Sequence, residues 1–333
     1  MSRVPDALPS FTGKLDFDVL QQAAEWFALL RAPDASQQDV QRWQAWCEAD
    51  GRHRAAWDRV EMISGRFDAV APADKPRTRV TLDVAAQRQL SRRRAVRMLA
   101  LLCSAGGIGW FATQGKPWQS WAASYRTAVG ERRHVALADG SSVWLNTASA
   151  MDADYGNTLR RIRLYEGEIL IQTAADSQAP SRPLVVDTRQ GRLRALGTRF
   201  NVRQFDDATE LAVHEGAVEI RLSSATDAEG ARVVPAGERL RFTRSAFMPL
   251  TASAPPTWAS GTLVADDMRL ADFIAELSRY RRGYLACAPQ VADLRIVGAY
   301  SLDDTERVLA ALQDTLPVRI RRTLPWWTVV EAR

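Results

Sequence analysis

The chain has 333 residues, 46% of them apolar and 25% charged. This balance excludes a disordered or fibrous protein, and the length suggests roughly two globular domains. Three His and three Cys occur without a CxxC or HExxH motif, and neither the GxxxxGK phosphate-binding motif nor GxSxG is present. We therefore expect no metal, no cofactor and none of the common nucleotide or hydrolase sites. The formal net charge is only +5.

The first 75 residues predict an all-α bundle of three helices. Apolar residues recur with the period of an amphipathic helix from Leu20 to Leu30. Ser36 and Asp39 have the spacing of a capping box at the start of a second helix, and Gly51 separates it from a third. Three helices of this length enclose only a marginal core.

Four tryptophans lie in these helices: Trp26, Trp43, Trp46 and Trp57. They are more than so small a core must bury. One interpretation is that all four are core residues. The other is that at least one side of the bundle docks a partner helix, because Trp is enriched among interface anchors.

Residues 98–115 contain no charged side chain over 18 positions. As a helix they would be about 27 Å long, close to the hydrocarbon thickness of a bilayer. The preceding segment carries eight basic residues and one acid from Lys75 to Arg97, whereas Lys116, Trp118 and Trp121 follow the span. Because basic flanks stay inside and Trp gathers at the interface, we expect one transmembrane helix with the N-terminal part in the cytoplasm.

Other interpretations of this region remain open. The apolar run could be a buried core helix. The stretch SRRRAV at 91–96 loosely resembles a twin-arginine export signal, and the basic run as a whole could bind nucleic acid. Its position directly before the span favours orientation and anionic lipid as the explanation for the basic residues. No direct contact with nucleic acid is therefore expected.

Residues 120–250 predict an all-β domain, a sandwich or a roll. Short runs of alternating apolar residues flank acidic–glycine dipeptides at 139–140, 166–167 and 215–216. Each dipeptide has the composition of a tight turn, so the pattern predicts three hairpins. Helical periodicity is absent from this part of the chain.

Residues 258–333 predict a compact α+β unit. The expected order is strand, helix, strand, helix and two paired strands, at 263–264, 269–280, 294–297, 301–316, 318–320 and 327–330. The apolar positions of both helices lie on one face, and Asp303 or Asp304 can cap the second helix.

Several stretches occur in a fixed order along the chain: AAEWFALLRAP and RWQAWCEADGRHRAAWDRV, then TAVGERRHVALADGSSVWLNTAS, RRIRLYEGE, ALGTRFNVR, VHEGAVEI and PAGERL, and finally GTLVADDMRLADFIAELSRYRRG and LRIVGAYSLDDTERVLAAL. In order and spacing they resemble the FecR family, transmembrane regulators of extracytoplasmic-function sigma factors. The resemblance extends from about residue 16 to the end and includes the single span.

The resemblance implies a division into five parts. These are a cytoplasmic sigma-factor-binding helical domain (1–75), a basic juxtamembrane linker (76–97), a transmembrane helix (98–115), a periplasmic FecR-type β domain (120–250) and a periplasmic α+β receptor-signalling domain (258–333). The last is expected to be similar to the short N-terminal domain of secretins and TonB-dependent receptors. The chain would then be a single-pass protein of the bacterial inner membrane.

The resemblance also implies partners on both sides of that membrane. The inner domain would bind an extracytoplasmic-function sigma factor, as an anti-sigma factor or an activator. The outer domains would read a signal from the signalling domain of a TonB-dependent outer-membrane receptor for an iron siderophore. Membrane proteases would relay that signal by regulated proteolysis. On this view the protein is not an enzyme.

One peptide bond, Gly197–Thr198 in ALGTRFNVR, is a candidate for chemistry. A Thr hydroxyl next to a strained backbone can attack the preceding carbonyl carbon, and Gly permits such strain. The resemblance implies a single-turnover self-cleavage at this bond. The alternative is that Gly197 serves a tight turn or bulge and Thr198 is an ordinary strand residue.

Two other functions are considered. A bitopic envelope protein whose β domain binds cell-wall glycan would have the same topology. A hydrolase would need His134 or His214, the outer histidines, but lacks a nucleophile elbow.

Overall fold

The computed structural model of the chain describes residues 14–32, 35–68, 122–225, 230–251 and 256–333. The predicted linker at 76–97 and transmembrane helix at 98–115 lie outside these residues. Within the described ranges, no helix is both long and apolar enough to cross a membrane.

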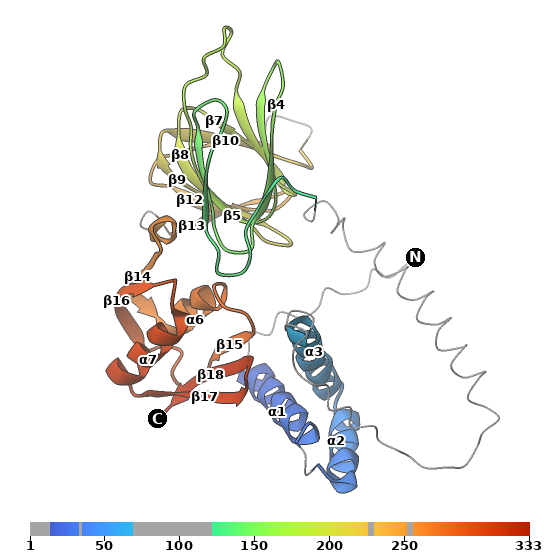
Figure 1. Cartoon of the computed structure of the whole chain (residues 1–333). Coiled ribbons are helices and arrows are strands. Elements are labelled where there is room, and N and C mark those ends of the chain that lie inside the picture. The colour runs from blue at the N-terminus through green and yellow to red at the C-terminus, as the bar shows by residue number, and fades with distance from the viewer. Residues whose placement is uncertain (1–13, 33–34, 69–121, 226–229, 252–255) are drawn as a thin grey trace, which may run out of the picture.

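The N-terminal part is helical, as the sequence predicts. Helices α1 (Lys14–Leu30), α2 (Gln37–Ala49) and α3 (Gly51–Asp68) pack against one another (Figure 1). The Ser36 side chain accepts a hydrogen bond from the Asp39 N–H, and the Asp39 carboxylate accepts one from the Ser36 N–H at 3.0 Å. This reciprocal pair confirms the predicted capping box and fixes the start of α2.

The middle of the chain forms one large curled sheet, which confirms the all-β prediction (Figure 1). Its strands are β1 (Tyr125–Arg126), β2 (Arg133–Ala136), β3 (Ser142–Leu145), β4 (Ala150–Tyr155), β5 (Arg160–Gln172), β6 (Leu184–Asp187), β7 (Gly191–Ala195), β8 (Arg199–Gln204), β9 (Thr209–Glu215), β10 (Ala217–Leu222), β11 (Ala231–Pro235), β12 (Arg239–Phe242) and β13 (Phe247–Leu250). The predicted hairpin at 139–140 is confirmed, because β2 and β3 pair around it.

The predicted turn at 166–167 is wrong. Strand β5 runs straight through this dipeptide, and its first half pairs with β4 and β6 while its second half pairs with β3 and β8. Gly167 has φ +85°, and a Cβ at this position would lie 2.5 Å from the Ser149 Cα. The glycine therefore bends one long strand where Ser149 crosses it, instead of reversing the chain.

The predicted hairpin at 215–216 is also wrong in its pairing. Strand β9 pairs with β8 and β12, whereas β10 pairs with β7 and β11. Gly216, with φ +72°, carries the chain from one part of the curled sheet to another. An acidic–glycine dipeptide between two strands of alternating apolar residues occurs both in hairpin turns and in connections to another part of a sheet. The sequence alone therefore does not distinguish the two structures.

The C-terminal part is an α+β unit. Its elements are η2 (Thr257–Ser260), β14 (Thr262–Arg269), α6 (Leu270–Ser278), β15 (Tyr284–Cys287), β16 (Arg295–Ser301), α7 (Thr305–Thr315), β17 (Val318–Leu324) and β18 (Trp327–Ala332). Strand β15, which the sequence analysis missed, pairs in parallel with β18, and β17 completes that sheet. Strands β14 and β16 form a second, two-stranded sheet.

The apolar interior falls into two clusters. One lies inside the curled sheet, and the other joins the C-terminal unit to the helical bundle. In the second cluster α1 lies against β17 and β18 (Figure 1), where the Phe27 and Trp326 rings meet edge to face at 5.7 Å. The Trp327 Nε1–H donates to the Gln21 Oε1 at 3.1 Å, and Arg321 pairs with Glu25.

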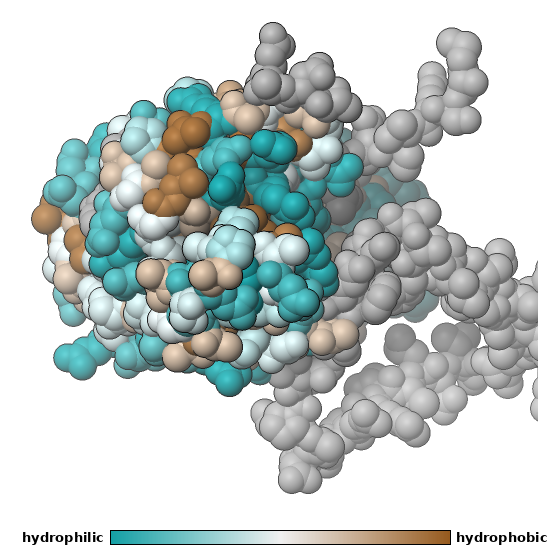
Figure 2. Space-filling view, turned by 90° about the horizontal axis from the view of Figure 1, so that it is seen from above, coloured by the Kyte–Doolittle hydropathy of each residue, from teal (hydrophilic) through white to brown (hydrophobic). Residues whose placement is uncertain are grey.

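The end of the curled sheet that lies away from the C-terminal unit has a mostly polar surface (Figure 2). Figure 2, seen from above, shows the end of the curled sheet that points away from the C-terminal unit, with hydrophilic residues around small apolar patches.

Candidate functional site

The four predicted tryptophans divide into a core group and a surface group. Trp57 is buried, and its ring lies 4.7 Å from that of Trp43 and 5.6 Å from that of Phe27. Trp26 and Trp46 are half-buried, with ring centroids 6.5 Å apart. The Trp46 ring stacks on His53 at 4.4 Å, and its Nε1–H donates to the Gln22 Oε1. Trp43 is half-buried as well and lies against Trp57, whereas Trp26, Trp46 and His53 form a second half-buried aromatic group.

The backbone at Gly197–Thr198 is held on both sides. Gly197 has φ +80°, and a Cβ on Gly216 would lie 2.2 Å from the Gly197 carbonyl oxygen. The Thr198 N–H donates to the Thr173 Oγ1 at 2.8 Å, and the Thr198 carbonyl accepts from the Thr173 N–H at 3.0 Å. Thr198 is 5% exposed, and its Oγ1 has no hydrogen-bond partner among the described residues. The hydroxyl is therefore not engaged elsewhere.

Gly197 also borders a cleft of about 530 Å³, which gives water access to this bond. Asp139 lies next to Arg160 of that cleft, with 2.6 Å between Oδ2 and Nη1. Burial raises the pKa of Asp139, but hydrogen bonds from Ser141 and Arg160 outweigh this effect and lower it. A fully paired carboxylate of this kind is a poor base.

Within the described part of the chain, His134 and His214 lack the partners of a hydrolase site. Burial and Arg199 lower the pKa of His214, and its Nε2 has no hydrogen-bond partner within the described residues. His134 is exposed, and its ring packs on Trp144 with 4.6 Å between ring centroids. Among the residues that the structure describes, neither imidazole has an acidic hydrogen-bond partner of the kind that orients a catalytic histidine.

A cluster that the sequence analysis missed joins the curled sheet to the C-terminal unit. Glu168 on β5 is 5% exposed, and its Oε2 lies 2.5 Å from the Nη2 of Arg279, the residue at the C-terminal end of α6. Asn146 and Asn201 each donate a side-chain N–H to the Glu168 carboxylate at 2.9 Å. The Asn146 Nδ2 also donates to the Tyr280 hydroxyl at 2.8 Å. We call this group, Asn146, Glu168, Asn201, Arg279 and Tyr280, the Glu168 cluster.

Neighbouring contacts extend the Glu168 cluster. Arg203 on β8 pairs with Glu276 on α6 at 2.9 Å, and Arg279 contacts Glu276 as well. The Thr147 hydroxyl donates to the Arg279 carbonyl at 3.0 Å, which satisfies one of the free carbonyls at the end of α6. The end of this helix is thus held by the β domain through charge and hydrogen bonds.

The charges in the Glu168 cluster stabilise one another. Burial raises the pKa of Glu168, but Arg279 and Arg203 outweigh it and hold that pKa below its ordinary value. Burial lowers the pKa of Arg279, but Glu168 and Glu276 outweigh it and raise it. Both groups are therefore ionised at neutral pH, and each requires the other as its partner.

Comparison with known families identifies two segments of the chain. Residues 123–219 match the family described as "FecR protein", and residues 21–63 match "Domain of unknown function (DUF4880)". The first segment contains most of the curled sheet, and the second contains most of the helical bundle. No curated protein matches this chain.

Two solved structures are similar in fold. Both are crystal structures of a protein from Parabacteroides distasonis ATCC 8503 named "putative anti-sigma factor", at 2.50 and 1.65 Å resolution. Each is 24% identical to this chain and covers 63% of it and 98% of its own length, with TM-scores of 0.48 and 0.49. The resemblance to FecR therefore depends on the match at 123–219.

Replacing Glu168 with Gln should loosen the junction. The substitution leaves the Arg279 charge buried without its partner, which typically costs about 3 kcal/mol. For a unit of this size we expect the calorimetric melting temperature of the full-length chain to fall by about 6–12 °C. The matched control is Glu238→Gln, because Glu238 is 48% exposed and 3.6 Å from Arg232. It should cost less than about 1 kcal/mol.

The same pair gives a pH dependence. Since the pKa of Glu168 is lower in the folded chain, its stabilisation is complete above the ordinary carboxyl value of about 4.3 and is lost as pH falls through the folded pKa. The difference in melting temperature between wild type and Glu168→Gln should be constant from pH 7 to about 5 and shrink below about pH 4. Equal effects of both substitutions would contradict the role of Glu168.

Proposed function

Since this chain carries a FecR domain at residues 123–219, we propose that it is a transmembrane regulator of an extracytoplasmic-function sigma factor. The FecR match is the observation that carries the proposal. The helical bundle is the sigma-binding part, as an anti-sigma factor or an activator. Its half-buried Trp26–Trp46–His53 group supports this assignment, because partly exposed aromatic residues are frequent interface anchors.

We propose that residues 98–115 span the inner membrane, with the bundle in the cytoplasm and the β domain and C-terminal unit in the periplasm. The uncharged run and the basic residues that precede it support this orientation. A bilayer between the two parts would prevent the contact of α1 with β17 and β18. That contact and this topology are therefore alternatives, which makes the topology directly testable.

In the periplasm the partner would be the signalling domain of a TonB-dependent receptor, one that senses an iron siderophore. The C-terminal unit offers an apolar surface for a protein partner: Val264 and Val297, on its two-stranded sheet, are 42% and 72% exposed. Membrane proteases would then release the sigma factor by cleaving this chain.

The sigma-factor role predicts direct binding. The purified full-length chain should bind an extracytoplasmic-function sigma factor encoded in the same genome with a Kd of about 1 µM or tighter. Trp46→Ala should weaken binding at least about 10-fold, since it removes an anchor, whereas Trp46→Phe keeps the aromatic stack and most of the affinity. Circular dichroism would check that α1–α3 stay folded. No binding to any such sigma factor would refute the role.

The proposed membrane topology predicts which pairs of introduced cysteines can form a disulfide. In a chain without Cys47, Cys103 and Cys287, the pair Gln21→Cys and Thr323→Cys joins positions whose native side chains lie 3.2 Å apart in the structure. We expect no cross-link in intact cells, and labelling of position 323 alone by an impermeant maleimide added to spheroplasts. The control pair Val264→Cys and Ala299→Cys, at directly paired positions of β14 and β16, should cross-link. A cross-link between 21 and 323 would contradict the topology.

We also propose self-cleavage at Gly197–Thr198. The Thr198 Oγ1 attacks the Gly197 carbonyl carbon, the C–N bond breaks, and the amide becomes an ester with a free amine on Thr198. Water then hydrolyses the ester, leaving a Gly197 carboxylate and a restored hydroxyl. The unpartnered, buried Oγ1 and the positive φ of Gly197 support this step.

Self-cleavage predicts two fragments that depend on one hydroxyl. Immunoblots of wild type should show full-length chain and a shorter C-terminal fragment beginning at Thr198. Thr198→Ala should give full-length chain only, while Thr198→Ser keeps a hydroxyl and should still cleave. Thr173→Val is the control and should still cleave, because it removes a neighbouring hydroxyl that is hydrogen-bonded to the Thr198 backbone but is not the attacking group. The same fragments from wild type and Thr198→Ala would exclude this chemistry.

A further inference from the structure

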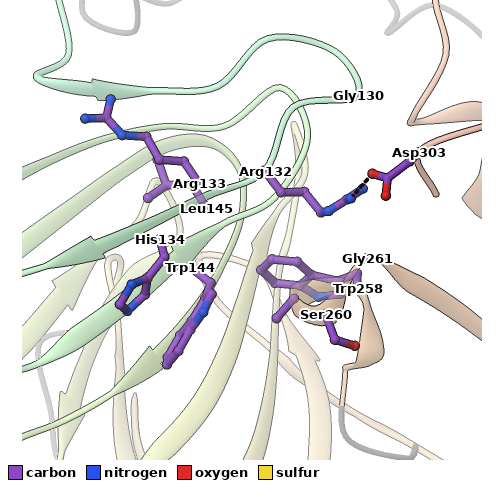
Figure 3. Close-up of a pocket in the computed structure, with 11 residues that line it drawn as sticks. Gly130, Arg132, Arg133, His134, Trp144, Leu145, Trp258, Ser260, Gly261 and Asp303 are labelled. Atoms are coloured by element: carbon purple, nitrogen blue, oxygen red, sulfur yellow. Dashed lines mark hydrogen bonds and ion pairs between the residues drawn. The ribbon is translucent and has the colours of Figure 1, made fainter. Parts of the chain in front are cut away.

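A cavity of about 440 Å³ lies where the curled sheet meets the C-terminal unit, away from the Gly197–Thr198 bond. Figure 3 shows its walls: His134 and Trp144 come from β2 and β3, and Trp258 and Asp303 come from the C-terminal unit. Arg132 extends between the two walls. The volume is in the range of sites that enclose small ligands.

The cavity has a cation with donor capacity to spare. Arg132 is 16% exposed and contacts Asp303 through Nη2, as the dashed line in Figure 3 marks. Its Nη1 is buried and has no hydrogen-bond partner among the described residues. Asp303 is 75% exposed, so water satisfies most of its carboxylate. Arg133 borders the cavity as well, but its guanidinium points away from it (Figure 3), so the charges inside are the Arg132 guanidinium and the Asp303 carboxylate.

Glycine at position 261 makes room for this guanidinium. Gly261 has φ +84°, and a Cβ there would lie 3.2 Å from the Arg132 Nη2. Any larger residue would be strained and would crowd the Arg132 side chain. Glycine at position 261 therefore leaves space for the Arg132 guanidinium.

The cavity also has flat apolar surfaces. Trp258 is 6% exposed, and its Nε1–H is a second buried donor without a partner in the described part of the chain. Trp144 is half-buried and packs on the exposed His134 ring, which extends the aromatic wall. Two unpaired donors require acceptors, and indole faces suit the flat C–H face of a sugar ring.

We propose that this cavity binds a sugar that carries a carboxylate. The carboxylate accepts a charge-assisted hydrogen bond from the free Arg132 Nη1, and the pyranose ring packs on the half-buried Trp144. The Trp258 Nε1–H donates to a ring substituent. Cell-wall muramic acid and the uronic acids of secreted polysaccharides share this chemistry. The proposal is independent of the sigma-factor role, since it concerns only binding by the outer part.

Calorimetric titration of the full-length chain in detergent tests the ligand class. The probes are N-acetylmuramic acid, glucuronic acid and N-acetylglucosamine, the last being a neutral control that differs from the first by the lactyl carboxylate. We expect at least one acidic sugar to bind at least 10-fold more tightly than N-acetylglucosamine. A preference for N-acetylmuramic acid would identify the cell wall as the source, and a preference for glucuronic acid a secreted polysaccharide. Equal affinities, or no binding by any probe, would overturn the proposal.

Variants separate binding from a structural role of Arg132. Arg132→Gln should weaken binding of the acidic sugar at least 10-fold. The control is Arg295→Gln, which removes an exposed arginine that is far from Arg132 in the sequence, and it should leave binding unchanged. Asp303→Asn breaks the same ion pair but keeps the guanidinium, so binding should be unchanged or tighter. If Arg132→Gln and Asp303→Asn weaken binding equally, Arg132 only supports the junction and the proposal fails.

Discussion

The continuity of strand β5 is the constraint on which the rest of the structure depends. Its first half pairs with β4 and β6, and its second half pairs with β3 and β8, so both parts of the curled sheet are joined through one strand. The strand serves both because it bends at Gly167, where only glycine fits against Ser149. The residue after the bend is Glu168, whose side chain the bend directs toward α6.

The burial of that carboxylate determines how the two outer units meet. A buried charge is costly unless it is paired and hydrogen-bonded. Glu168 obtains amide donors from Asn146 and Asn201 within its own domain, but its cationic partner, Arg279, belongs to the C-terminal unit. The β domain therefore completes its own electrostatics only when α6 is in place. The apolar interior contributes less here, since most of the β domain's buried side chains form a cluster of their own.

The features that the sequence predicts correctly depend on interactions between residues that are close together in the chain. The Ser36–Asp39 capping box and the apolar face of α6 follow from residues three or four apart, and both were predicted correctly. The sequence around Gly167 and Gly216 predicts hairpin turns. Whether such a glycine forms a turn or a bend depends on a residue that packs against it from elsewhere in the chain, as Ser149 packs against Gly167. Glu168 and Arg279 are 111 residues apart and belong to no local motif. A buried acid inside an otherwise apolar strand run was the one available signal.

Helix α6 takes part in both the apolar packing of the C-terminal unit and the polar contacts with the β domain. Its apolar side, including Leu270 and Phe273, is fully buried in the C-terminal unit, whereas its last residues are bound by charge to Glu168 and by the Thr147 hydroxyl. A helix of this kind moves as a rigid body, so a partner that shifts the C-terminal unit must also displace Arg279 from Glu168. Separating that pair is unfavourable in the closed junction but becomes cheaper once water enters. A polar junction between two apolar cores can therefore release at a defined place while each core stays folded, and the relay proposed above would use this property.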